Sequence, residues 1–407
     1  MRILFLTNLL PYPLDNGGKI KSYTTISALA DAGHKIDLLC FTEKNNIQEE
    51  YENQLLKLCQ KVEQVYLKLT TAENMQYMRL IAVKSLFSTY SFGLYKYQSD
   101  KMKQKLEKLC LENNYECIYF DHLQLCVYKE YLEKLLPKAK MILDEHNCEA
   151  LIMSRNADKS TNVMKKLFLQ IESKKLAKFE SRILGEMDTN IVLSEEDYKE
   201  LRKLHKGDFK HSIIPIGVPD RGIKKSVEKK DDLLKILFLG TLTWEPNNQG
   251  LIWFLKNVIP LLERKNIKFK FYIVGKNPSV EVCELAKNNV NITVTGYVES
   301  VDEYYEKCDC MVVPLFIGSG QRVKLIESFS KGMPSVSTEI GAEGLQIENH
   351  KNILIANTAE EFSDAIEELN NYSIRRTLFL EGRKCYENNY SPEAVAAKIN
   401  DVIRQLK

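Results

Sequence analysis

The chain opens with a short apolar segment that runs directly into a turn and then into a helical pattern. Residues 2–7, RILFLT, precede a stretch rich in proline, asparagine and glycine, a helical pattern covers 19–33, and a second apolar run begins at Lys35. A strand, a helix and a strand in this order form a β-α-β unit with parallel strands and a right-handed crossover. Further runs of strand length lie at 62–67, 117–120, 140–143, 190–193 and 212–215. This pattern predicts a doubly wound α/β domain.

The same opening recurs in the second half of the chain, where KILFLGTLTWEPNNQG repeats the strand, the turn and the helix start. Strands are predicted there at 268–274, 292–295, 310–314, 335–337 and 353–355. Residues 217–232 are polar and have no apolar period, which is typical of a linker. A chain of 407 residues suits two domains. We therefore expect Rossmann-like domains at 1–216 and 233–390, with the closing helix 391–407 joining the first.

Composition argues against several classes of protein. The 57 basic and 55 acidic side chains leave a formal charge of +2, too small a field to attract nucleic acid. No run of 18 apolar residues occurs, and the start is too polar for a signal peptide, so a cytoplasmic location is expected. Ten cysteines without a Cys-x-x-Cys pair predict reduced, mostly buried thiols and no metal site.

Glycine is concentrated in the second half of the chain. Nine of the 18 glycines fall between Gly240 and Gly344, and several directly follow predicted strands. The carboxyl ends of parallel strands form the ligand crevice of open α/β sheets. The glycine distribution therefore predicts a ligand site in the second domain.

One segment of that domain, PLFIGSGQRVKLIESFSKG, has the composition of an anion site. Gly318, Ser319 and Gly320 allow backbone amides to approach an anion at a helix N-terminus, and Arg322 and Lys324 add two cations. This combination predicts diphosphate binding.

The same helix carries a carboxylate. If it begins near Gln321, Glu327 lies on the face of Lys324, three residues further on, where its two oxygens can accept hydrogen bonds from two ribose hydroxyls. The alternative is a surface ion pair on an amphipathic helix. In the first domain, Gly17 and Gly18 lie in a second loop before a helix, where backbone amides can bind an anion. The chain has no complete G-x-G-x-x-G, which argues against a nicotinamide dehydrogenase.

These segments resemble the retaining, nucleotide-sugar-dependent glycosyltransferases of family 4. The resemblance covers nearly the whole chain and rests on PYPLDNGGKIKSYTTISALADAGHKIDLLCF and VVPLFIGSGQRVKLIESFSKGMPSVSTEIGAEGL, supported by DEHNCEALIMSR and FLGTLTWEPNNQGLIWFLKNVIPLL. It implies a GT-B arrangement of two Rossmann-like domains facing across a cleft. It also implies metal-independent transfer of a sugar from a nucleotide diphosphate sugar to an acceptor hydroxyl, in cell-envelope polysaccharide or glycolipid synthesis, with no separate cofactor.

The resemblance assigns roles in the donor domain. Glu327 matches the second glutamate of the family's Glu-x7-Glu motif, which holds the ribose, whereas Ser319 stands where the first glutamate usually contacts the donor sugar. Many members bind the diphosphate through an Arg and a Lys in the loop after the first strand of this domain. Here that loop begins with Gly240 and Thr241 and contains neither cation. We therefore expect Arg322 and Lys324, at the start of the later helix, to bind the diphosphate instead.

The acceptor side is implied in the same way. The glycine pair at 17–18 would line the cleft near the reacting sugar. Either Asp121 or His122, which follow a predicted strand, would contact the donor sugar. Candidates for the acceptor region are Lys19, His146 and Asn147.

Two alternatives stay open: a sugar-nucleotide epimerase on the same scaffold, and a non-catalytic subunit that binds a glycan or a protein. The basic and apolar segment MKKLFLQIESKKLAKFESR, which begins at Met164, also predicts peripheral contact with an anionic membrane at the inner face of the cell. The alternative for that segment is a solvated helix face.

Overall fold

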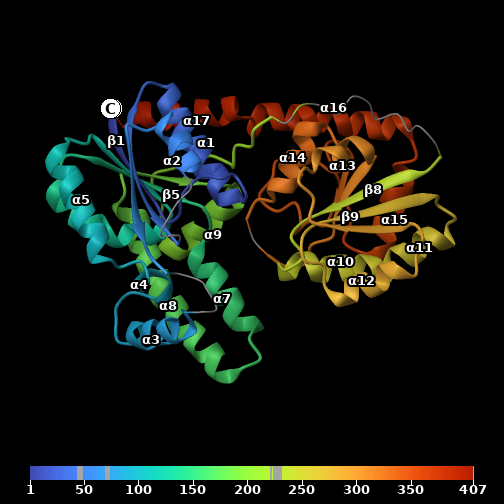
Figure 1. Ribbon diagram of the computed structural model, residues 1–407, viewed down its shortest axis with the longest axis horizontal. Coiled ribbons are helices and arrows are strands. Elements are labelled where there is room, and N and C mark those ends of the chain that lie inside the picture. The colour runs from blue at the N-terminus through green and yellow to red at the C-terminus, as the bar shows by residue number, and fades with distance from the viewer. Residues whose placement is uncertain (44–48, 69–73, 221, 223–231, 319, 407) are drawn as a thin grey trace. The chain divides into compact units, whose positions relative to one another are not determined.

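The computed structural model describes residues 1–43, 49–68, 74–220, 222, 232–318 and 320–406. The chain divides into two compact units (Figure 1). Unit 1 consists of Met1–Gly217 with Val395–Lys407, and unit 2 of Val218–Ala394. The predicted linker, 217–232, lies largely outside the described residues. In the ranges that the structure covers, no helix has both the length and the apolar character needed to cross a bilayer.

Unit 1 is built on a seven-stranded parallel sheet with the order β3-β2-β1-β4-β5-β6-β7. Its strands are β1 (Arg2–Thr7), β2 (Lys35–Thr42), β3 (Lys61–Tyr66), β4 (Cys117–Asp121), β5 (Lys140–Glu145), β6 (Thr189–Val192) and β7 (His211–Ile213). Its helices are α1 (Gly17–Asp31), α2 (Glu49–Leu56), α3 (Met75–Leu86), α4 (Phe92–Tyr95), α5 (Asp100–Glu112), η2 (Leu123–Tyr128), α6 (Lys129–Leu135), α7 (Glu149–Lys159), α8 (Val163–Glu186), α9 (Glu195–His205) and most of α17 (Pro392–Gln405).

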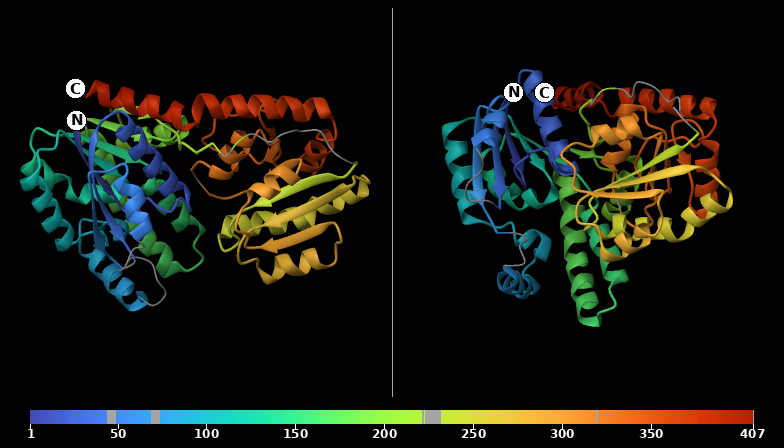
Figure 2. Two further views of the ribbon diagram at one scale, coloured as in Figure 1. Left: turned by 45° about the horizontal axis from the view of Figure 1, so that its top comes forward. Right: turned by 45° about the vertical axis from the view of Figure 1, so that its right-hand side comes forward.

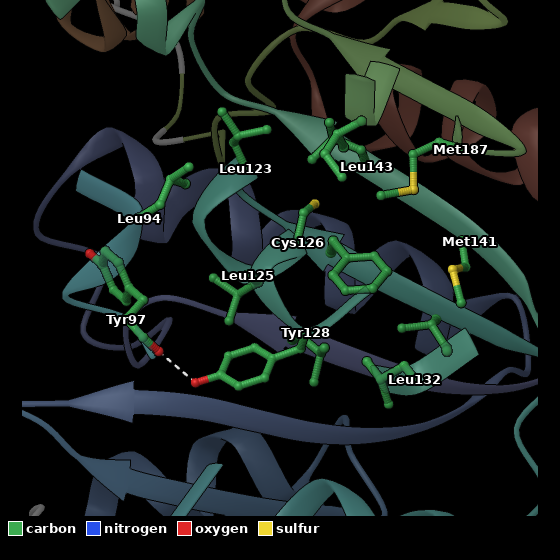
Figure 3. Packing of buried hydrophobic residues seen from close by; sticks show 14 of the residues in the cluster. Leu94, Tyr97, Leu123, Leu125, Cys126, Tyr128, Leu132, Met141, Leu143 and Met187 are labelled. Atoms are coloured by element: carbon green, nitrogen blue, oxygen red, sulfur yellow. Dashed lines mark hydrogen bonds between the residues drawn. The ribbon is translucent and has the colours of Figure 1, made fainter. Parts of the chain in front are cut away.

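Both faces of this sheet are buried, which explains why its strands read as continuous apolar runs. Leu4 and Leu6 of β1 belong to one hydrophobic cluster, part of which is drawn in Figure 3, and Ile3 and Phe5 belong to the other. Four residues of α17 complete the second cluster: Val395, Ile399, Val402 and Ile403. The closing helix therefore packs on unit 1.

Unit 2 has a six-stranded parallel sheet with the order β10-β9-β8-β11-β12-β13. Its strands are β8 (Leu234–Leu239), β9 (Phe269–Val274), β10 (Ile292–Gly296), β11 (Cys310–Val313), β12 (Ser335–Ser337) and β13 (Leu354–Ile355). Its helices are α10 (Glu245–Asn257), α11 (Ile259–Arg264), α12 (Val280–Lys287), α13 (Asp302–Lys307), α14 (Val323–Lys331), α15 (Ala359–Glu368) and α16 (Tyr372–Asn389).

The structure confirms the two Rossmann-like sheets and corrects the start of one helix. α14 begins at Val323 with Arg322 as its extended N-cap residue, two residues later than expected. Gly318 and Gly320 have φ angles of +122° and +79°, which keep the preceding loop out of the helical region. All ten cysteines are free, and eight of them are buried, as predicted.

Candidate functional site

The carboxyl ends of β8 and β11 bring the predicted donor residues of unit 2 together. Lys324 of α14 donates a hydrogen bond from Nζ to Oδ1 of Asn247 on α10, at 2.9 Å. The side-chain amide of Asn247 donates to the carbonyl of Thr241, at 3.0 Å. A Cβ atom at Gly240 would lie 2.6 Å from the Asn247 amide nitrogen and 2.8 Å from Lys324 Nζ. A larger residue at position 240 would therefore have to displace one of these two side chains.

The second cation lies one residue before the same helix. Arg322 is largely buried, and its guanidinium carbon lies 5.6 Å from the centre of the Trp244 ring. A Cβ atom at Gly318 would lie 2.6 Å from Nη2 of Arg322, so the glycine loop lies directly against the guanidinium group. The start of α14 thus brings two cations to the loop between β8 and α10, which has none of its own.

The surroundings of Lys324 and Arg322 lower the pKa of both side chains. Burial and the nearby Arg322 lower the pKa of Lys324 to about 7, although the Glu327 carboxylate opposes the shift. Burial also lowers the pKa of Arg322. An anion bound here would favour the charged form of both groups. The arrangement therefore suits a phosphate ligand. Ser319, which was predicted to lie beside these cations, is outside the described residues.

The predicted polar residues of unit 1 form a buried network at the end of β4. The Asp121 carboxylate accepts hydrogen bonds from Ser22 Oγ at 2.6 Å and from His146 Nε2 at 2.8 Å. Nδ1 of His122 lies 3.2 Å from the same carboxylate. The rings of His122 and His146 are 3.7 Å apart between their centres. The sheet thus brings Asp121, His122 and His146 together.

Asp121 is the more enclosed of the two predicted sugar contacts. Its side chain is fully buried and is surrounded by the serine and the two histidines, a position that suits a residue that orients the imidazoles. His122 has a φ of +103°, a strained value for a non-glycine residue, and such strain is concentrated at functional sites. A Cβ atom at Gly18 would lie 3.9 Å from Nε2 of His122, so this ring lies beside the glycine pair.

The network also shifts the pKa values of the two imidazoles in opposite directions. Burial alone would raise the pKa of Asp121, but His146 and His122 hold it well below its usual range. Burial would lower the pKa of His122, yet Asp121 raises it. Burial and the neighbouring His122 lower the pKa of His146. These directions favour an ionised Asp121 with a protonated His122 and a neutral His146.

The sequence-based prediction did not single out Lys21, Tyr119 or Asn247 at these sites. Lys21 on α1 forms a buried ion pair with Asp144 at the end of β5, and Tyr119 donates a hydrogen bond to the same carboxylate at 2.6 Å. Lys21 lies four residues before buried Thr25, so a cation on the buried face of α1 is the signal that could have found this pair. Asn247 lies in the Trp-x-Pro-Asn segment that supported the family resemblance.

The remaining acceptor candidates are less closely grouped. Lys19 forms an ion pair with Asp15 at 2.9 Å, in the loop that precedes α1. Asn147 follows β5 and is half-buried. The ligand atoms of the Asp121, His122 and His146 group lie within 4.8 Å of one another, a spacing that also suits a metal ion. Both imidazoles already lie against the single carboxylate, so we interpret the group as an internal network.

Comparison with known proteins supports the resemblance in unit 2. Residues 234–371 match the family model of the glycosyl transferases group 1. Over its whole length, the chain is similar to a protein described as an uncharacterised 44.6 kDa protein in the cps region of Klebsiella pneumoniae. The two are 24% identical over 413 residues, which cover 98% of each chain.

Solved structures with the same fold include three that cover nearly the whole chain. Sucrose-phosphate synthase from Thermosynechococcus elongatus is 16% identical, with a TM-score of 0.70 and coverage of 100% of this chain and 99% of that one. HepE from Anabaena, in complex with UDP and glucose, is 14% identical, with a TM-score of 0.65 and full coverage of both chains. WaaG, a glycosyltransferase involved in lipopolysaccharide biosynthesis, is 13% identical, with a TM-score of 0.64 and coverage of 98% and 99%. These structures show the fold that the chain shares with them, and the family match concerns residues 234–371 of unit 2.

Proposed function

We propose that the protein transfers a sugar from a nucleotide diphosphate sugar to an acceptor hydroxyl, with retention of the anomeric configuration and without a metal ion. The observation that carries this proposal is the meeting of Lys324, Asn247 and Gly240 beside Arg322, inside the segment that matches the glycosyltransferase family. Two cations at a helix start and a glycine-lined strand end suit the diphosphate of such a donor.

In this proposal, Arg322 and Lys324 stabilise the leaving nucleoside diphosphate. Its negative charge grows as the bond to the sugar breaks, so fixed cations aimed at it lower the barrier. The departing phosphate accepts the proton of the acceptor hydroxyl. Glu327 binds the two ribose hydroxyls, and Gly318 and Gly320 admit the phosphate oxygens.

Unit 1 is assigned to the acceptor and to the donor sugar. His122, which Asp121 holds in place and which lies beside Gly18, is the residue that we expect to contact a hydroxyl of the donor sugar. The similarity to WaaG and to a protein of a cps region supports a role in cell-envelope polysaccharide or glycolipid synthesis.

The first test is a thermal-shift panel of nucleoside diphosphates and their sugars. UDP and UDP-glucose come first because HepE has been solved with each of them. A ligand at 100 times its Kd raises the free energy of unfolding by about 2.7 kcal/mol. If none of these nucleotides raises the Tm, the result contradicts the proposal.

The second test follows turnover of the donor that binds. Transfer to an added glycan acceptor with release of nucleoside diphosphate supports a transferase, conversion of the donor without release supports the epimerase, and binding without turnover supports the non-catalytic subunit. NMR of the product reads the anomeric configuration directly. Activity that persists in EDTA supports the metal-independent reaction, and its loss would contradict it.

A further inference from the structure

Two fully buried glutamates of α8 each bind the start of another helix. Glu172 accepts a hydrogen bond from the backbone N–H of Phe92, the first residue of α4, and forms an ion pair with Lys175 at 2.9 Å. Glu180 accepts hydrogen bonds from the first two backbone N–H groups of α7, at 2.8 and 3.1 Å. α7 and α8 lie side by side (Figure 1, Figure 2). α8 therefore fixes the position at which both α4 and α7 begin.

The start of α7 depends on this contact, because its own cap residue does not supply one. The N-cap residue, Cys148, makes no side-chain hydrogen bond to the helix, and a thiol is a weak acceptor. The first N–H groups of a helix have no partner within the helix, so a buried helix start needs acceptors from elsewhere. Glu180, which lies 31 residues after the first residue of α7, provides them.

The start of α7 is joined directly to the network of unit 1. Residues 146–148 connect the end of β5 to α7, and they include two of the acceptor candidates, His146 and Asn147. His146 bonds through Nε2 to the carboxylate of Asp121 at 2.8 Å. The pairing of β5 holds one end of this short loop, and Glu180 holds the other end through α7. The two anchors together fix the position of the loop.

The first residue of α7, Glu149, also acts on the other imidazole. Its carboxylate is hydrogen-bonded to the side chains of Gln124 and Asn147. Burial lowers the pKa of His122, whereas Asp121 and, more weakly, Glu149 raise it. A displacement of the start of α7 would therefore move a carboxylate that favours the protonated form of His122.

The surroundings of Glu180 differ from those of Glu172. Burial raises the pKa of Glu180, the N–H groups of α7 lower it, and Glu149 raises it. The last residue of β5, Glu145, is also buried, and burial and Glu180 raise its pKa. Within the described residues, Oε2 of Glu145 accepts no hydrogen bond. Buried carboxyl groups with raised pKa values are concentrated at functional sites.

We propose that Glu180 is a positioning residue of the unit 1 site. By binding the start of α7, it holds the loop 146–148 in place and keeps the Glu149 carboxylate near His122. This role rests on the proposed function, in which His122 contacts the donor sugar. A carboxylate that only stabilised the fold would affect the Tm without affecting the two imidazoles.

The first test is NMR of the histidine rings across a pH titration, which needs no sugar donor. Glu180→Gln keeps the shape of the side chain but offers one acceptor oxygen in place of two, so one N–H of α7 loses its partner. We expect changed ring signals for His122 and His146, and a lower pKa for His122 as the Glu149 carboxylate moves away. Glu149→Gln, at a half-buried side chain, leaves both N–H contacts of α7 in place and should also lower the pKa of His122.

Glu172→Gln is the matched control, because Glu172 lies on the same helix, is equally buried and binds the start of α4, which carries no residue of the network. Both α8 variants should lower the Tm, but only Glu180→Gln should change the ring signals. Glu180→Gln should also reduce kcat about tenfold or more, with little change in the KM for UDP-glucose, since a misplaced group near the reacting atoms affects turnover more than donor binding in unit 2.

Three results would overturn the proposal: unchanged ring signals in a folded Glu180→Gln protein, equal changes in Glu172→Gln, or a pKa of His122 that Glu149→Gln does not alter. Failure of the proposed function gives a different result. Changed ring signals in Glu180→Gln, together with a wild-type protein that turns over no nucleotide sugar, would support the link from Glu180 to the imidazoles and contradict the transferase activity.

Discussion

The first six strands of unit 1 have the same order as the six strands of unit 2, but different charged groups meet at the ends of the central strands of the two units. In unit 1, Lys21 pairs with the buried Asp144, and the buried Asp121 lies between two imidazoles. In unit 2, Lys324 bonds to the neutral amide of Asn247 beside a second cation. A neutralised network holds side chains in place, whereas grouped cations favour an incoming anion. The difference shows that one scaffold can provide a rigid site and an anion site through the residues at its strand ends.

The largest effect is expected from breaking the buried pair of unit 1. Lys21→Met leaves the fully buried Asp144 without its cation and should lower the free energy of unfolding by about 3–5 kcal/mol. Lys19→Met, two residues earlier, breaks an ion pair with the exposed Asp15 and should cost less than about 1 kcal/mol. Urea unfolding measures both. A loss for Lys21→Met that is as small as the loss for Lys19→Met would show that the Lys21–Asp144 pair does not stabilise the fold.

The next effect concerns turnover in unit 2. Arg322→Ala and Lys324→Ala should each reduce kcat by about 100-fold or more, about 2.7 kcal/mol of transition-state stabilisation. Arg322→Lys should not rescue fully, because an ammonium cannot make a two-pronged contact with phosphate oxygens. The exposed Arg376 provides the control, and Arg376→Ala should leave steady-state kinetics unchanged. Normal turnover in a folded Arg322→Ala or Lys324→Ala protein would mean that the diphosphate is held elsewhere.

A smaller effect should follow from the carboxylate on α14. Glu327→Gln keeps the shape of the side chain but removes a charged acceptor from the ribose hydroxyls, so UDP binding should weaken by about 1–3 kcal/mol. Calorimetry measures the affinity, and Glu306→Gln on the exposed part of α13 serves as the control. If affinity is unchanged while the Tm falls, the carboxylate supports the fold or Lys324 rather than the nucleotide.

The smallest effect is a pH dependence in the donor site of unit 2. Because the pKa of Lys324 is lowered to about 7, the ligand-free protein loses this positive charge as the pH rises through 7. Affinity for UDP-glucose, whose two phosphates carry no titrating group near this pH, should therefore fall by up to about tenfold between pH 6 and pH 8, or about 1.4 kcal/mol. Lys324→Met should bind weakly at every pH. A wild-type affinity that is constant from pH 6 to 9 would contradict the shifted pKa.

Most of the fold could be predicted because its signals are local. Apolar runs such as RILFLT and KILFLG end at turn residues, and these boundaries mark the strands whatever lies elsewhere in the chain. The start of α14 was predicted two residues early, because helical periodicity does not reveal the positive φ angles of the glycine loop. The candidate cations Arg322 and Lys324 were also found locally, from their place between glycines and a helix.

The partners of those residues depended on tertiary structure. Asn247 lies 77 residues from Lys324, and Asp144 lies 123 residues from Lys21. The sequence shows that Asp121 ends a strand, but not that a serine and two histidines surround its carboxylate. The sequence by itself determined the two sheets and the residue types at their strand ends. Strand pairing and helix packing decided which of those groups meet. A local sequence pattern cannot predict these contacts, because they join segments that are far apart in the chain.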